Sequence, residues 1–270
     1  MSQIYQDNIL YLFGSQLSPT QTTEEFSSSF LYSIDILQTP LKMIIEVNSR
    51  YSHYYPTLAL LRNEFLIAIG GYATKHCESY SISNKKWKEL PDLIEERYGA
   101  SALCDNKYNF IYVFGGLNNE TGKCGLTVFK LNMNVGIKWD TLVVMSNAEC
   151  LAKMNSVIIK TDDRQVYILG GANCEGEQSN EIVCIDFKNK VITPQVDKDK
   201  QLYQKGLFIS LRHGSANNNG NIYAMDDSEE MENVIHKIDK HKSSFVLLNE
   251  ALHQYKKNIN NNYIIHSIYK

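Results

Sequence analysis

Alternating apolar and polar positions mark the chain as a series of short strands. The segment FLIAIGGYATKHCESYSISNKKWKEL, residues 65–90, opens with an apolar run, passes through Gly70 and Gly71, and continues into a second alternating run before Trp87. Alternation with a period of two is typical of strands that pack on a pleated surface. The polar residues 83–86 are of the kind that close tight hairpins. The segment therefore predicts three antiparallel strands joined by short turns.

The same pattern recurs along the whole chain. A hydrophobic run that ends in two glycines, or in other residues at their place, is found five times at spacings of about 56, 45, 55 and 55 residues. These runs are ILYLFGS (9–15), FLIAIGG (65–71), FIYVFGG (110–116), QVYILGG (165–171) and NIYAMDD (221–227). A fixed period of this length predicts an array of repeated structural units.

Each repeat is expected to contain four strands. A second alternating run follows the glycines, and a third strand has a large apolar residue near its start. These large residues are Met43, Trp87, Trp139, Val191 and Phe245. A fourth run precedes the next glycine pair, at 57–61, 100–104, 155–160 and 206–211. Four antiparallel strands make one blade of a β-propeller, so the sequence predicts an all-β propeller in a single domain, residues 1–270.

Several of these residues resemble the kelch repeat. The features in common are the Gly-Gly pair, Tyr80 with Trp87 seven residues later, and the leads Arg50-Tyr51-Ser52-His53 and Arg97-Tyr98-Gly99 before a strand. The resemblance is strong over residues 50–187 and weaker elsewhere. We expect glycines where the chain approaches the next blade, and large aromatic residues in the wedge between blades. The expected structural positions are Gly70, Gly71, Tyr80, Trp87, Gly115, Gly116, Trp139, Gly170 and Gly171.

The spacing of the repeats predicts about five blades, with six as the alternative. The chain is expected to start at a second strand, Ile9, so that the first blade lacks its innermost strand. The segment NYIIHSIY, residues 262–269, is placed to supply that strand and close the ring, which removes exposed strand edges. Because the pattern begins by residue 9, we expect a bare propeller without the BTB or F-box domain of many kelch proteins.

Composition and motifs exclude several kinds of function. The net charge of −3 and the absence of a basic stripe argue against nucleic acid and anionic membranes, and no apolar stretch approaches the length of a membrane span. Six cysteines without a C-x-x-C pair, in a chain without a signal peptide, indicate reduced thiols and a cytoplasmic protein. No nucleotide-binding or G-x-S-x-G motif is present. We expect no metal, no cofactor and no catalytic residues.

Arginine and tyrosine concentrate in the loops expected at one face of the propeller. These residue types are enriched at interface hot spots. The candidate partner-binding residues are Arg50, Tyr51, His53, Tyr55, Arg97, Tyr98 and Tyr203. In kelch proteins such arginines commonly contact acidic peptides, so the resemblance implies a protein or peptide partner. The alternative for Arg50 and Arg97 is that they brace the blade junctions, and Glu95 and Glu96 would partly neutralise Arg97.

Two classes of function stay open from the sequence. The first is a non-enzymatic scaffold or assembly subunit that binds a protein partner, with the cytoskeleton as one setting. The second is a propeller enzyme that acts on a small molecule or a carbohydrate. The expected innermost strands TLALL, ASALC and NSVIIK carry few ionisable side chains, whereas a catalytic channel needs convergent polar groups. The sequence therefore favours the scaffold.

Overall fold

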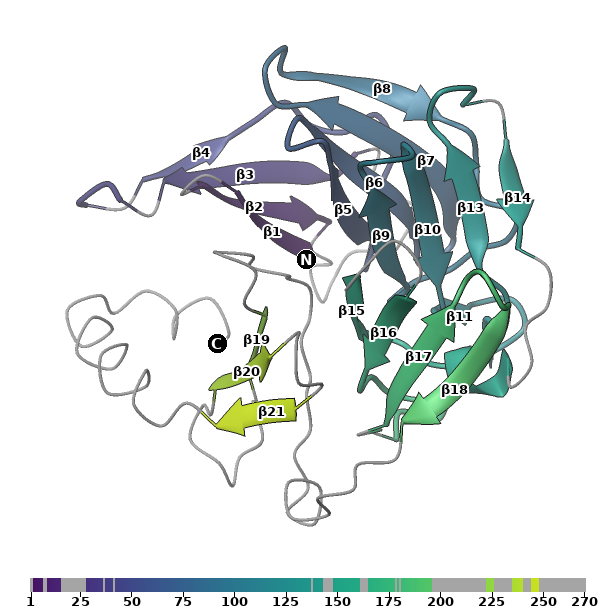
Figure 1. Cartoon of the computed structure of the whole chain (residues 1–270). Helices are drawn as coiled ribbons and strands as arrows, with labels where there is room; N and C mark the ends of the chain where they lie inside the picture. Colours follow the sequence, from purple (N-terminus) through teal and green to yellow (C-terminus); the bar gives the residue numbers. More distant parts are fainter. Residues whose placement is uncertain are drawn as a thin grey trace.

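The computed structural model consists of antiparallel sheets arranged around a common centre (Figure 1). It describes residues 2–6, 9–15, 28–35, 37–40, 42–136, 138–142, 148–160, 165–177, 179 and 181–195, together with three strands nearer the C-terminus. Those strands are β19 (Ile222–Met225), β20 (Ile235–Asp239) and β21 (Ser244–Leu247).

Four sheets have four strands each, in chain order from the centre outward. The first two contain β1 (Ser2–Gln6), β2 (Ile9–Gly14), β3 (Phe30–Asp35), β4 (Met43–Ile45), β5 (Thr57–Leu61), β6 (Phe65–Gly71), β7 (Thr74–Ser81) and β8 (Lys86–Leu90). The third contains β9 (Ser101–Asp105), β10 (Phe110–Phe114), β13 (Phe129–Asn132) and β14 (Trp139–Thr141). The fourth contains β15 (Val157–Lys160), β16 (Gln165–Leu169), β17 (Ile182–Asp186) and β18 (Val191–Gln195). Strands β19 to β21 form a fifth sheet.

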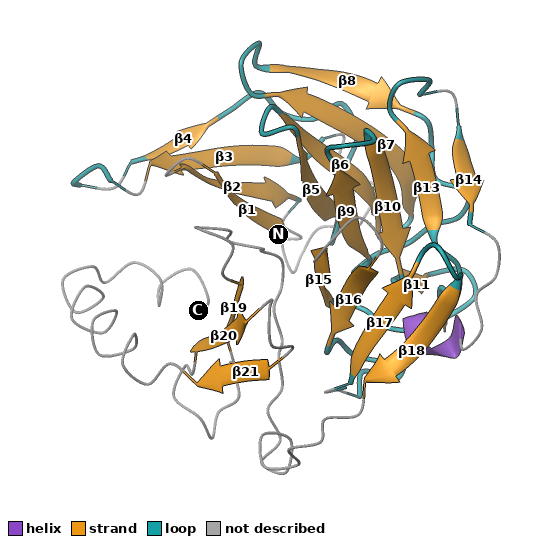
Figure 2. Ribbon diagram, in the orientation of Figure 1, coloured by secondary structure: helices purple, strands orange, loops and turns teal. Residues whose placement is uncertain are grey.

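Two small elements complete the described secondary structure. The ribbon of β11 (Leu117–Asn118) and β12 (Lys123–Cys124) is inserted between β10 and β13. A short 3-10 helix, η2 (Ala148–Leu151), lies beside β18 (Figure 2). The architecture is the predicted all-β propeller. The number of blades, five or six, and the closure of the ring stay predictions.

The first blade has its own innermost strand, contrary to the prediction that the chain starts at a second strand. Strand β1 pairs with β2 along its whole length, from Ser2 opposite Phe13 to Gln6 opposite Ile9. The hydroxyl of Ser2 donates to the carbonyl of Pro56, as Thr57 does to Ala100 in the next blade. Because β1 fills this position, the place predicted for residues 262–269 is taken. Residues 206–211 and 262–269 lie outside the described residues.

The hydrophobic core lies between neighbouring sheets, so the second strands β6 and β10 are buried on both faces. In β6, Ile67 and Ile69 pack against the third sheet, while Leu66 and Ala68 pack against the first. Each fully buried side chain of this size contributes about 1.5–3 kcal/mol. This two-sided burial explains why the second strands read as continuous apolar runs.

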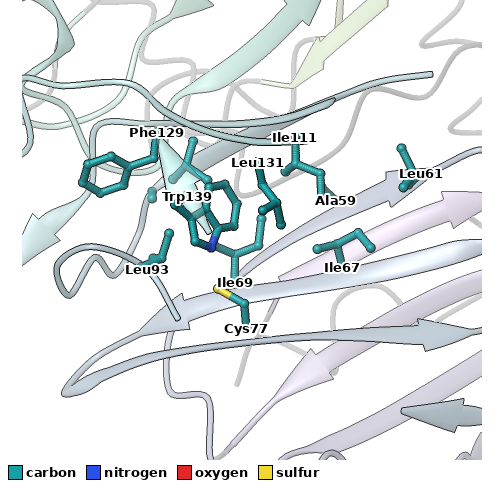
Figure 3. Close-up of a cluster of buried hydrophobic side chains, with 12 residues drawn as sticks. Ala59, Leu61, Ile67, Ile69, Cys77, Leu93, Ile111, Phe129, Leu131 and Trp139 are labelled. Atoms are coloured by element: carbon teal, nitrogen blue, oxygen red, sulfur yellow. The ribbon is translucent and has the colours of Figure 1, made fainter. Parts of the chain in front are cut away.

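Both tryptophans fill the wedge between blades. Trp139 joins the cluster between the second and third sheets shown in Figure 3, and its indole N–H donates to the carbonyl of Pro91 at 2.8 Å. Trp87 packs against Tyr80, with ring centroids 5.1 Å apart, and donates to Val47 O at 2.6 Å. Each indole therefore ties an outer strand to the loop that leaves the preceding blade.

The glycine pairs lie where neighbouring loops approach most closely. Gly70 has a φ of +54°, and a Cβ there would lie 2.8 Å from the carbonyl oxygen of Arg97. At Gly116, with a φ of +82°, it would lie 2.7 Å from the Cβ of Ala100. Both the positive φ and the contact exclude larger residues.

Candidate functional site

The loops that lead into the innermost strands are connected to one another by a repeating set of backbone bonds. In each case the amide at the second position of a glycine pair, or at its equivalent, donates to a carbonyl in the loop that enters the next blade. The bonds join Ser15 to His53 at 3.0 Å, Gly71 to Arg97 at 3.1 Å and Gly116 to Lys153 at 2.8 Å. His53, Arg97 and Lys153 each lie four residues before an innermost strand. They are therefore the same position in successive blades.

The guanidinium of Arg97 is buried and forms its hydrogen bonds within the protein. Its side chain is 1% exposed, and Nη1 donates to Gly115 O at 2.9 Å and to Thr127 O at 2.8 Å. The group also lies 2.6 Å from Glu95 Oε1 and 4.1 Å from the centre of the Phe129 ring. Burial lowers the pKa of Arg97, and Glu95 opposes this shift. Arg97 thus links the end of β10 to the segment that leads into β13.

His53 has the corresponding role in the second blade. It is fully buried, with Nδ1 2.8 Å from Gly70 O and Nε2 3.1 Å from Glu78 Oε2. Glu78 also accepts the amides of Arg50 and Tyr51 at 3.0 and 3.1 Å. Burial raises the pKa of Glu78, but these hydrogen bonds outweigh it, so the pKa is lowered overall.

The candidate partner residues His53 and Arg97 are therefore corrected to residues that brace the blade junctions. Neither offers side-chain surface to a partner, because each is buried and bonded to main-chain carbonyls. Arg50 is not the equivalent of Arg97, since His53 occupies that position. Lys153, the third member, was not among the predicted residues, and its Nζ lies 3.0 Å from Glu181 Oε2. The sequence carried no clear signal for it, because the strand was expected to begin at residue 155 and begins at Val157.

Arg50 and Tyr51 lie in an exposed polar chain. Arg50 Nη1 is 2.6 Å from Glu89 Oε1, and the Tyr51 hydroxyl donates to the same oxygen at 2.7 Å. The Tyr51 ring stacks on His76, with centroids 3.8 Å apart. His76 Nδ1 lies 2.9 Å from Asp92 Oδ1. Both residues are accessible, and their contact with a partner stays a prediction.

Four tyrosines from three loops form one aromatic cluster, which we call the tyrosine cluster: Tyr54, Tyr55, Tyr72 and Tyr98. The ring centroids are 4.4 Å apart for Tyr54 and Tyr55, 6.2 Å for Tyr54 and Tyr72, and 5.4 Å for Tyr72 and Tyr98. Tyr55 is 41% exposed and the others are half-buried. Burial raises the pKa of Tyr54 and Tyr98, so their hydroxyls are neutral near pH 7. The cluster presents aromatic faces and hydrogen-bonding tips on one surface.

Tyr55 has an unusual backbone for its residue type. Its φ is +51°, and the equivalent positions in the next two blades are Gly99 at +60° and Asn155 at +54°. The three are linked in a row, because Gly99 N–H donates to Tyr55 O at 3.2 Å and Asn155 N–H to Gly99 O at 2.7 Å. Glycine and asparagine tolerate this conformation, whereas a tyrosine costs about 1–2 kcal/mol. The fold accepts a tyrosine here at a cost to stability.

The candidate partner-binding residue Tyr203 lies outside the described residues. In the described part of the chain, no three His, Cys, Asp or Glu side chains gather as a metal site would require. No helix within the same part has the length and apolar character needed to cross a membrane.

Comparisons with known proteins support the fold. The chain is 26% identical to a kelch repeat-containing protein of Dictyostelium discoideum over 132 residues, which cover 42% of the chain and 20% of that protein. The solved structure of YjhT matches with a TM-score of 0.52 and 12% identity, over 73% of this chain and 66% of that one. No protein-family profile matches. The chain thus spans about a fifth of the curated relative.

The repeated sheets and the shared inter-blade bonds define a propeller built from equivalent units. Over 132 residues the chain is also similar to the kelch repeat-containing relative, which agrees with a repeat of this kind.

Proposed function

We propose that this propeller is a protein-interaction module that binds a protein or peptide partner through the face around the tyrosine cluster. In this proposal it acts as a scaffold or assembly subunit and performs no catalysis of its own. The contact surface comprises Tyr55, Tyr98 and their neighbours in the tyrosine cluster, with Arg50 and Tyr51 beside them. Large aromatic side chains with polar tips suit such a surface.

The observation that carries the proposal is the tyrosine at position 55. A fold requirement alone would be met by glycine or asparagine, as in the two following blades. A side chain that is 41% exposed in a strained backbone conformation gains little from burial. Strained residues of this kind are found disproportionately at binding sites. We therefore attribute this tyrosine to a contact outside the chain.

The proposal is tested by comparing Tyr55 with Tyr108, which is 47% exposed in the turn between β9 and β10. A photo-reactive phenylalanine analogue would replace each tyrosine in turn, and the tagged protein would be irradiated in an extract of its own cells. We expect a discrete cross-linked partner from position 55 and none from position 108. Equal labelling from both positions, or none from position 55, would contradict the proposal.

A second variant separates binding from folding. Tyr55→Asn relieves about 1–2 kcal/mol of backbone strain and loses about 0.5–1.5 kcal/mol of aromatic contact with Tyr54. The free energy of unfolding should therefore change by less than about 1.5 kcal/mol, while the partner is lost. A variant that unfolds more readily and keeps its partner would show that the tyrosine serves the fold.

A further inference from the structure

The surface charge around the tyrosine cluster differs from that expected of a face that binds acidic peptides. The three equivalent basic residues of the blade junctions, His53, Arg97 and Lys153, are buried. Each also lies within 3.1 Å of a carboxylate of the same chain, from Glu78, Glu95 and Glu181 in turn. These three buried side chains are therefore unavailable to an acidic ligand.

Few other cations are exposed on the described part of this face. Over loops 48–56, 72–76, 91–99, 117–123, 148–153 and 172–177, the exposed cationic side chains are Arg50, Lys75 and Lys123, and His76 is half-exposed and lies beside Asp92. Arg50 is paired with Glu89, whose carboxylate also accepts the Tyr51 hydroxyl. A ligand that carries negative charge would find little to neutralise it here.

Carboxylates outnumber these cations on the same loops. The exposed or half-exposed ones are Asp92, Glu95, Glu96, Glu120, Glu149, Glu175 and Glu177. Glu120, Glu149, Glu175 and Glu177 have no ion-pair partner in the described part of the chain. The loops belong to one surface, because Tyr98 exchanges backbone bonds with Leu117, and Met154 exchanges them with Ala172.

Glu96 adds an independent observation. Its Oε2 is buried and has no hydrogen-bond partner among the described residues. It lies two residues before Tyr98, in the loop that contributes that tyrosine to the cluster. A buried carboxylate oxygen without a donor is costly.

From this surface we infer that the partner presents a cationic segment, with several arginine or lysine side chains, to the tyrosine cluster and the carboxylates beside it. The inference rests on the function proposed above for the same face. Aromatic faces attract arginine and lysine through their quadrupole, and the neighbouring carboxylates attract the same groups. An acidic segment would bring like charges together, which costs several kcal/mol.

The test uses two short fluorescein-labelled peptides and fluorescence anisotropy. One alternates arginine with glycine, and the other has glutamate in place of each arginine. We expect the arginine peptide to bind and the glutamate peptide not to bind. The combined Glu120→Gln, Glu175→Gln and Glu177→Gln variant should bind the arginine peptide about tenfold more weakly, as expected for three exposed charge pairs. Tyr72→Ala should reduce binding by a similar factor.

The matched controls lie at the opposite ends of the strands. Glu64 is an exposed carboxylate in the turn between β5 and β6, and Tyr108 is an exposed tyrosine in the following blade. Glu64→Gln and Tyr108→Ala should leave binding unchanged. Equal weakening by Glu64→Gln and by the combined variant would indicate non-specific attraction and overturn the inference.

The remaining outcomes separate this inference from the proposed function. If the glutamate peptide bound, or if neither peptide bound, the inference that the partner is cationic would be wrong. The cross-linking experiment at position 55 would still decide whether the face binds a protein. A cross-linked partner whose attached segment is acidic would leave the function standing and refute the inference.

Discussion

The replacement of Arg97 by methionine tests whether the buried basic residues brace the blades. Methionine keeps the apolar stem of the side chain and its packing on Phe129, but removes the charge and all the donors. Gly115 O and Thr127 O would each lose the donor that Arg97 Nη1 now supplies at 2.9 and 2.8 Å. An unsatisfied buried acceptor costs about 1–3 kcal/mol. The loss of the ion pair with Glu95 destabilises the protein less, because the Glu95 side chain is 43% exposed and can be hydrated.

Taken together, these losses predict a destabilisation of about 3–5 kcal/mol, the range for breaking a buried charged network from one side. For a chain of this size the midpoint of thermal unfolding should fall by roughly 10 °C. The assay is urea and thermal unfolding followed by tryptophan fluorescence, since Trp139 packs between the second and third sheets.

Arg50→Met is the matched control. The side chains of Arg50 and Glu89 are 69% and 47% exposed, and exposed ion pairs contribute about 0–1 kcal/mol. We therefore expect the control to unfold within about 1 kcal/mol of the unmodified protein. If the two variants were equally stable, Arg97 would not be a brace and the assignment of equivalent positions would be wrong.

Two further predictions concern the glycines and the buried acid. Gly70→Ala should destabilise by clearly more than Gly136→Ala in urea unfolding, because both have positive φ but only Gly70 has atoms within 3 Å of the added Cβ; similar losses would mean that the loops move apart at no cost. The lowered pKa of Glu78 gives a contribution to stability that is fully present above about pH 4.5. It is lost as the pH falls through the pKa of Glu78 in the folded protein. Glu78→Gln should therefore flatten the pH dependence of unfolding below about pH 4.5, and an unchanged slope would refute this.

Two strands could be predicted residue by residue, whereas the strand expected at 100–104 lies one residue later and the strand expected at 155–160 begins two residues later. The segments TLALL and FLIAIGG coincide with β5 and β6, because continuous apolar runs bounded by turn residues have no alternative strand limits. Strand β1 was missed because the two apolar residues of SQIYQ are adjacent, so the segment shows no alternation and looks like a polar tail. The ribbon of β11 and β12 has two residues per strand, which is too short for any periodicity.

The candidate site was harder to predict, because the letters of a motif do not fix its position in space. Arg50-Tyr51 and Arg97-Tyr98 look alike, yet His53 is the residue that corresponds to Arg97. What decides equivalence is the distance to the next innermost strand, and loop length hides that distance in the sequence. The contact between Tyr72 and Tyr98 joins loops of neighbouring blades and leaves no trace in either loop alone.

Tyr55 shows how such a failure can itself be informative. It precedes Pro56, and residues before proline favour extended conformations with negative φ. The observed φ of +51° contradicts that local rule, although the rest of the loop follows the same hydrogen-bond scheme as its two neighbours. Local rules are expected to fail where function constrains a residue more than folding does. Tyr55 thus adopts a conformation that neither tyrosines nor residues before proline prefer. We therefore propose Tyr55 as the centre of the binding face.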